Sequence, residues 1–265
     1  MDAGVAAAVL AASLLHASWH ALVKSSGDGV IALAGMNLVS AAVAVFLLPF
    51  VRLPTPAAAL VIGISVVLHA GYKIALAQLY ARADLSQGYP LARGLTPIFA
   101  TAIGLGFLGE APSLATLAGV AAISIGIVSL GFERSTRALS AGGFAAALAV
   151  GMSVAAYSAL DAYGIRINGD WLGFTAWLVL CDSTAFVAYA IATRRDRALA
   201  QWRLTWPRTL LSGLLGVASF GVFLWALSRA QVGAVTALRE TSSIFAAVIA
   251  LIAMFIAALG NRFGG

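Results

Sequence analysis

Charged residues and cysteines are scarce in this sequence, and each scarcity excludes a class of protein. Only 10% of the 265 residues are charged while 62% are hydrophobic, and the mean hydropathy of +0.98 is far from that of a soluble domain. The single cysteine, Cys181, stands inside an apolar run, which excludes a disulfide framework and a cysteine-based metal site. No nucleotide-binding motif occurs, so any transport would draw its energy from gradients.

The sequence has instead a series of apolar runs, each about 20 residues long, the length that crosses a ~30 Å hydrocarbon core. With no alternating ten-residue pattern, helices are favoured over a β-barrel. The first run has no Lys or Arg before it, unlike a signal peptide, so we expect it to be retained. We predict an all-α polytopic membrane bundle of nine spans, at residues 3–23, 30–50, 57–80, 85–108, 114–132, 141–160, 171–192, 209–227 and 232–259.

Two further features bear on how these spans are joined and packed. Residues 193–208 hold five arginines with Trp202 and Trp206, so this connection is expected at the level of the lipid headgroups. Small residues recur along two predicted helices and predict faces where backbones approach closely. These faces are formed by Ala102, Gly106 and Gly109, and by Ala115, Gly119 and Ala122.

An internal repeat relates the two halves of the chain. Residues 80–100 align, with one gap, to residues 227–246, and this alignment pairs Arg93 with Arg239. A weaker match aligns residues 17–23 with 155–161 and pairs Trp19 with Tyr157. Because the first half has an odd number of spans, the second copy must enter the membrane from the opposite side, as in inverted-repeat transporters.

Three segments resemble the EamA branch of the drug/metabolite transporter superfamily, and the likeness covers nearly the whole chain. They are Tyr89-Pro-Leu-Ala-Arg-Gly-Leu-Thr-Pro97, Leu108-Gly-Glu110 and Leu238-Arg-Glu-Thr-Ser242. The resemblance implies ten helices in two inverted five-helix halves, with the substrate pathway between them. Residues 1–138 would form the first repeat and residues 139–265 a truncated second one, in which the tenth helix is expected to be missing.

Basic residues between the spans predict the orientation. Ten lie in loops after odd-numbered spans and three on the other side, which favours an external N-terminus in a multi-pass protein of the inner (plasma) membrane, whereas the resemblance implies a cytoplasmic one. The ten are Lys24, Arg82, Arg134, Arg137, Arg194, Arg195, Arg197, Arg203, Arg208 and Arg262, and the three are Arg52, Arg166 and Arg229.

Five charged residues fall within apolar spans, where each charge costs at least about 2.5–3.5 kcal/mol and so needs a cavity or a partner. They are Lys73, Arg93, Asp182, Arg239 and Glu240. Pseudo-symmetry would turn both arginines toward a central pathway to receive an anionic group, and Pro90 and Pro97 would break the helix there. The alternatives are that Arg239 pairs with Glu240 or Asp182 and that Arg93 reaches the interface.

Lys73 is a candidate for a proton-linked or substrate-contacting amine, with an ion pair to Asp182 or Glu240 as the alternative. His16 and His20 lie one turn apart and can line a pore, hold zinc with further ligands such as His69 and Asp182, or serve as structural histidines. Trp19 and Tyr89 complete the predicted substrate-binding set. Trp19 and Tyr157 have packing as their alternative.

The predicted function is secondary transport, specifically export, of a small polar or anionic metabolite such as an amino acid or organic acid, by alternating access. The predicted partners are the lipid bilayer and this substrate, without nucleic acid, and a homodimer is left open. We expect no cofactor, no metal and no enzymatic activity. The rival hypotheses are a membrane-embedded metal-dependent enzyme built on His16 and His20, and a non-transporting remnant or sensor.

Overall fold

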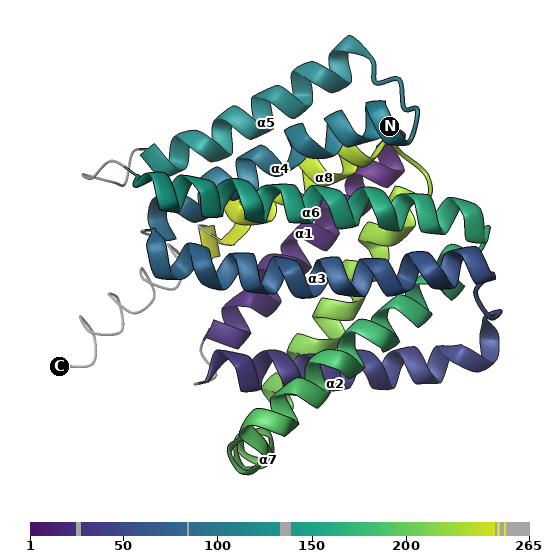
Figure 1. Cartoon of the computed structure of the whole chain (residues 1–265), viewed down its shortest axis with the longest axis vertical. Coiled ribbons are helices and arrows are strands. Elements are labelled where there is room, and N and C mark those ends of the chain that lie inside the picture. The colour runs from purple at the N-terminus through teal and green to yellow at the C-terminus, as the bar shows by residue number, and fades with distance from the viewer. Residues whose placement is uncertain (25–27, 84, 133–138, 247, 250–251, 253–265) are drawn as a thin grey trace.

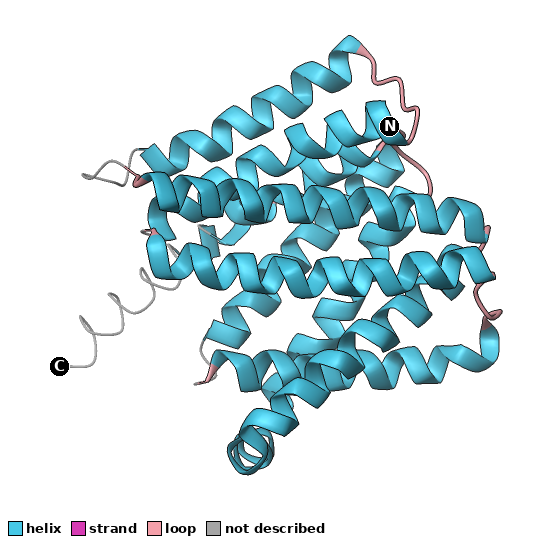
Figure 2. Ribbon diagram, viewed as in Figure 1, coloured by secondary structure: helices cyan, strands magenta, loops and turns pink. Residues whose placement is uncertain are grey.

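The computed structural model describes residues 1–24, 28–83, 85–132, 139–246, 248, 249 and 252. Within these residues every regular element is a helix, as Figure 2 shows. The elements are α1 Ala3–Lys24, α2 Gly29–Leu47, the 3-10 turn η1 Leu48–Phe50, α3 Pro56–Arg82, α4 Leu85–Phe107, α5 Leu114–Phe132, α6 Ala141–Asn168, α7 Trp171–Leu227 and α8 Val232–Glu240. The prediction of an all-α fold is confirmed for this part of the chain.

Seven described helical segments are long and apolar enough to cross a membrane. They are Ala3–Val23, Gly29–Phe50, Pro56–Leu79, Leu114–Gly131, Ala141–Asn168, Trp171–Arg194 and Asp196–Leu227. The helix α4 occupies the predicted fourth span but is not among the seven, and α8 has only 9 residues before a turn at Thr241. The rest of the predicted ninth span and the position of a tenth lie largely outside the described residues.

Residues 193–208 were predicted to form a connection between two spans. They belong instead to α7, which is interrupted only by a kink. Arg194 alone has non-helical backbone angles, φ −146° and ψ 27°, and it divides α7 into two straight segments. Arg194 pairs with Asp28, the residue whose side chain caps the start of α2. Trp202 is buried against α2, where its Nε1 donates to the Ile31 carbonyl at 2.8 Å.

The two prolines of α4 do not break that helix, contrary to the prediction. Pro90 and Pro97 lie inside a helix of 23 residues. Each proline removes one backbone donor, but in a membrane bundle neighbouring helices and hydroxyl side chains hold the helix together around such sites. Thr96 and Thr101 donate to the carbonyls of Ala92 and Pro97, one turn earlier.

The helices pack around α4 and α6, which bring the two halves of the chain together. In Figure 1, α3 and α6 lie side by side across the bundle, α5 packs on the outer side of α4, and α2 lies against α7. The short helix α8 fits between α4 and α1. The helix α8 therefore packs against helices of the first half of the chain.

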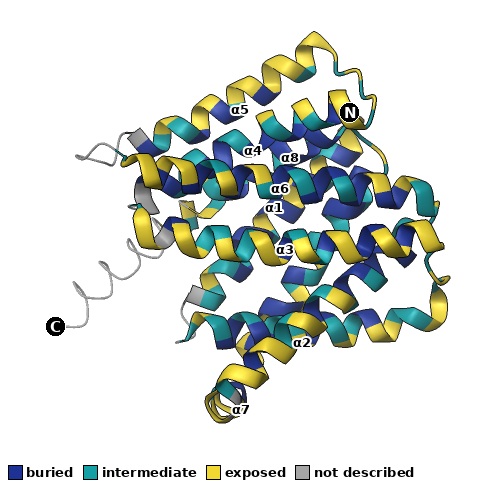
Figure 3. Ribbon diagram, in the orientation of Figure 1, coloured by how far each residue is buried: buried dark blue, intermediate teal, exposed yellow. Residues whose placement is uncertain are grey.

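Large apolar side chains cover much of the outer surface, and Figure 3 shows the outer face of α5 almost wholly exposed. A soluble monomer rarely exposes such continuous apolar area. The interior is built from small residues and polar groups, with serines buried on most helices. This distribution fits a bundle whose outer surface faces lipid.

The small-residue faces predicted on α4 and α5 are not where helices approach closely. All six residues of those faces are exposed, and added Cβ atoms at Gly106 and Gly119 would meet nothing within 4 Å. The close approaches lie elsewhere: a Cβ at Gly151 would come within 2.8 Å of the Ala92 carbonyl, and one at Gly213 within 2.4 Å of Val39. Spacing alone does not tell which face of an alanine-rich helix turns inward.

Gly151→Ala is expected to lower the free energy of unfolding by about 1–3 kcal/mol, because the added methyl group must push α6 away from the α4 backbone. Gly126→Ala on α5 is the matched control, since its Cβ would meet nothing and alanine gains helix propensity of about 1 kcal/mol. Thermal unfolding of both variants in one detergent measures the difference. Equal melting temperatures would contradict the close approach of α4 and α6.

Candidate functional site

Charged side chains from both halves of the chain meet where α4 passes the end of α8. Arg93 comes from α4, and Arg239 and Glu240 are the last two residues of α8. The helix ends there because Thr241 forms a turn, in which its hydroxyl donates to the Leu238 carbonyl at 2.6 Å. These charges therefore lie inside the bundle.

Arg93 and Glu240 form a buried ion pair. Arg93 Nη1 lies 3.2 Å from Glu240 Oε1, and their side chains are 5% and 0% exposed. Arg93 Nη2 also donates to the Tyr89 hydroxyl at 2.7 Å. The alternative that Arg93 reaches the interface is therefore wrong, and the predicted candidates Arg93, Tyr89 and Glu240 are brought together.

Arg239 does not pair with its neighbour Glu240, because adjacent residues on a helix do not face each other. Its guanidinium lies over the Phe223 ring, 4.1 Å from the centroid, and it interacts with the Tyr157 hydroxyl both electrostatically and through a side-chain hydrogen bond. Its Nη1 is buried and has no hydrogen-bond partner among the described residues. The site thus holds one arginine bound to a carboxylate and one with an unused donor.

The polar stripe of α1 borders the same centre. Ser13 donates to the Leu238 carbonyl of α8 at 3.0 Å, and both arginines lie near enough to His16 and His20 to act on them electrostatically. The Nε2 atoms of the two histidines are 3.2 Å apart, and Trp19 stacks on His20 with ring centroids 3.7 Å apart. Trp19 therefore packs within α1, while the histidines line the centre.

No group of three or more His, Cys, Asp and Glu side chains that could hold a metal ion occurs within the described chain. His69, considered above as a further zinc ligand, instead stacks on Tyr157 at 4.1 Å, and Asp182 binds Lys73. The part of the chain that is described therefore offers the metal-enzyme hypothesis no ligand set.

Lys73 stands apart from the arginines. Its Nζ lies 3.0 Å from Asp182 Oδ1, with side chains 34% and 22% exposed, and it also lies over the Phe186 ring at 4.6 Å. The ion-pair alternative considered for Lys73 is the one observed. A partly exposed pair of this kind contributes little to stability.

Three residues of the interior were not identified from the sequence: Phe223, Ser65 and Asp161. Asp161 was missed because the sixth span was predicted to end at residue 160, whereas α6 continues to Asn168 and places Asp161 in the interior. Ser65 precedes His69 by one helical turn, so it lies on the same polar face of α3 as His69, Tyr72 and Lys73. This spacing could have identified Ser65 from the sequence.

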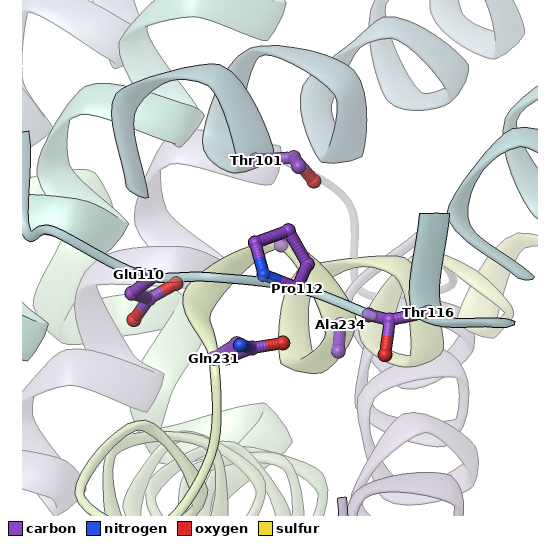
Figure 4. A pocket seen from close by; sticks show the side chains of 7 residues that line it. Thr101, Glu110, Pro112, Thr116, Gln231 and Ala234 are labelled. Atoms are coloured by element: carbon purple, nitrogen blue, oxygen red, sulfur yellow. The ribbon is translucent and has the colours of Figure 1, made fainter. Parts of the chain in front are cut away.

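Glu110, from the Leu108-Gly-Glu110 segment, joins the halves at the opposite end of α8. Both of its carboxylate oxygens accept from the Val232 backbone N–H, at 3.2 and 3.0 Å, and Arg166 at the end of α6 pairs with it. A small, partly open hollow adjoins it, and Figure 4 shows Thr101, Pro112, Thr116 and Gln231 around it. None of the predicted substrate-binding residues lines this hollow.

Glu110→Ala is expected to lower the free energy of unfolding by about 1–3 kcal/mol, because the buried Val232 N–H loses its acceptor. Glu110→Gln should cost less, since its amide oxygen can still accept that bond. Arg166→Gln is the control for the half-exposed ion pair and is expected to cost at most about 1 kcal/mol. Chemical denaturation in detergent ranks the three, and an equal loss in all of them would contradict the capping role.

The chain matches no family model and no curated protein. The resemblance of its motifs to EamA-type transporters therefore enters the functional argument only as a proposal.

Proposed function

We propose that the chain is a secondary transporter that exports a small polar or anionic metabolite, such as an amino acid or organic acid, by alternating access. The class is supported by the seven apolar helices and by ionisable side chains that face the bundle interior, which mark transport pathways more often than structural sites. The lipid bilayer and this substrate are its partners, and the inner (plasma) membrane is its location.

The proposed architecture is two inverted repeats of the EamA type with nine spans. Support comes from the two aligned arginines, Arg93 and Arg239, which belong to different halves and lie around one polar centre with His16 and His20. In inverted-repeat transporters the substrate binds at such an interface between halves. The repeat would make α4 and the helix that starts with α8 equivalent elements.

The observation that carries the proposal is the unused donor of Arg239. A buried polar group without a partner costs free energy, so a site that keeps one is prepared for a ligand. A carboxylate bound there would receive a charge-assisted hydrogen bond from Nη1. The Arg93–Glu240 pair is neutral overall, so Arg239 gives the centre its net positive charge.

The ligand pocket would also have an aromatic wall. Phe223 lies under the guanidinium of Arg239, and Trp19 and His20 stack beside the centre. Since aromatic rings favour packing against apolar substrate groups, the best fit is a small acid with an apolar side chain.

The test is counterflow of ¹⁴C-labelled amino acids and organic acids into proteoliposomes, comparing the parent with Arg239→Gln. Hydrogen bonds to charged groups contribute about 1.5–3 kcal/mol, so uptake of anionic compounds should fall about 10- to 100-fold. Arg229→Gln is the matched control, because Arg229 is exposed and lies over Trp225 outside the centre.

Parent protein that exchanges none of the labelled compounds would refute the transporter, and Arg239→Gln that matches the parent would refute the anion-binding role. Activity that requires a stoichiometric metal and is lost on chelation would favour the rival enzyme.

A further inference from the structure

A buried carboxylic acid that the proposed substrate site does not use lies in the last third of α6. Asp161 is 0% exposed, and the Ser65 hydroxyl of α3 donates to its Oδ1 at 2.5 Å. Its second oxygen, Oδ2, is buried and has no hydrogen-bond partner among the described residues. Ser158, one turn earlier on α6, also has a buried hydroxyl oxygen without a described partner.

Asp161 differs from the acids Glu240 and Asp182 in having no cationic partner among the residues described. Glu240 has Arg93 within 3.2 Å and Asp182 has Lys73 within 3.0 Å, but no Lys, Arg or His of the described chain lies within salt-bridge distance of Asp161. An ionised carboxylate in such surroundings is far more costly than a protonated one. The carboxyl group of Asp161 is therefore suited to bind a proton at Oδ2.

A polar stripe on α3 leads from Asp161 toward the surface. Ser65, His69 and Lys73 follow one another at single helical turns, so they lie on one face. His69 Nδ1 lies 2.9 Å from the Ser65 carbonyl and 3.3 Å from its hydroxyl. Exposure rises along the stripe, from 0% at Ser65 to 34% for the Lys73 side chain.

Charged groups on the neighbouring helices face this acid from different sides. Asp182 on α7 and Arg239 on α8 are the charged groups near it on those helices, while Ser65 and His69 approach from α3. From α4, Arg93 acts on Tyr157, one turn before Asp161 on α6.

We propose that Asp161 is the proton-binding site that couples transport to the proton gradient, with Ser65, His69 and the Lys73–Asp182 pair as the route along α3. This inference rests on the proposed transport function and adds its coupling ion. At each step the proton leaves one group of the stripe, whose O–H or N–H bond breaks, and forms an O–H or N–H bond on the next group. The last step forms the O–H bond of Asp161, and release reverses these steps.

The first experiment does not depend on transport. Infrared difference spectra of the purified protein, recorded across a pH jump, should show the C=O stretch of a protonated carboxyl group. The band should vanish in Asp161→Asn and persist in the control Asp196→Asn, whose side chain is exposed. Ser65→Ala keeps the acid but removes its hydrogen bond, so it should shift the pH at which the band appears. A band that survives in Asp161→Asn, or that does not move in Ser65→Ala, would overturn the site.

The second experiment separates coupling from transport in proteoliposomes with the same ¹⁴C-labelled compounds. An imposed pH gradient should drive the parent and Asp196→Asn to accumulate the compound. Asp161→Asn should retain counterflow but reach no more than the outside concentration. Counterflow with no response of the parent to the pH gradient, or accumulation driven by sodium instead, would overturn the proton site and leave the transporter standing. Loss of parent counterflow would instead remove the transporter itself.

Discussion

Replacing Glu240 with leucine is expected to lower the free energy of unfolding by about 3–5 kcal/mol, the usual cost of removing one partner of a buried ion pair. The reason is that Arg93, 5% exposed, would keep its charge in the interior with only the Tyr89 hydroxyl as its described partner. Arg93→Met should cost a similar amount, because it leaves the Glu240 carboxylate alone at 0% exposure. Thermal and chemical unfolding in one detergent measure both variants.

The double variant Arg93→Met/Glu240→Leu should recover most of that loss, because apolar side chains of similar volume often replace a buried pair without penalty. The matched control is Lys73→Met with Asp182→Leu, whose partly exposed pair should contribute at most about 1 kcal/mol. Single variants at Arg93 and Glu240 as stable as the parent would contradict the ion pair.

The stable double variant also tests function. A purely structural pair predicts that transport returns together with stability, whereas a pair that positions Arg239 and Tyr89 for the substrate predicts a folded protein without counterflow. We expect the second result, because Glu240 follows Arg239 directly and Tyr89 binds Arg93. Counterflow of the labelled acids by the double variant at the parent's rate would exclude that role.

The helices were predictable from the sequence because each apolar run is as long as a bilayer is thick. Their ends were not. Hydropathy places a boundary where charged residues begin. The predicted sixth span therefore ended at Leu160, and residues 193–208, with their five arginines, were predicted to be a connection. The backbone of α6 and α7 continues past both places, since arginine, alanine and leucine are good helix formers in any solvent.

Some members of the polar centre were predictable from the sequence, but their pairing was not. The internal repeat singled out Arg93 and Arg239, and both contribute to one centre. Which of them binds Glu240 depends on the rotation of α8 about its axis, and no sequence pattern fixes that rotation. Asp161 shows the same limit, because a single acid in an alanine-rich run says nothing about which neighbour it faces.

Trp202→Ala is expected to lower the free energy of unfolding by about 3–5 kcal/mol, because it empties a packed site between α2 and α7. The indole fills the space over Gly35, where an added Cβ would come within 2.7 Å of its Nε1, and it donates to the Ile31 carbonyl. Trp202→Phe should cost less, since it keeps the ring and loses the hydrogen bond. Unfolding in detergent measures each loss.

Trp206→Ala is the control, because Trp206 is one turn away and 47% exposed, and it should change stability little. Equal losses at both positions would contradict the buried contact of Trp202. The contact also bears on the mechanism, since α2 and α7 belong to different halves of the chain. If the halves rock against each other, either α2 and α7 move together as one rigid body or their contact breaks in each transport cycle. If Trp202→Phe folds stably but exchanges substrate at an altered rate, the α2–α7 contact is one that changes during transport.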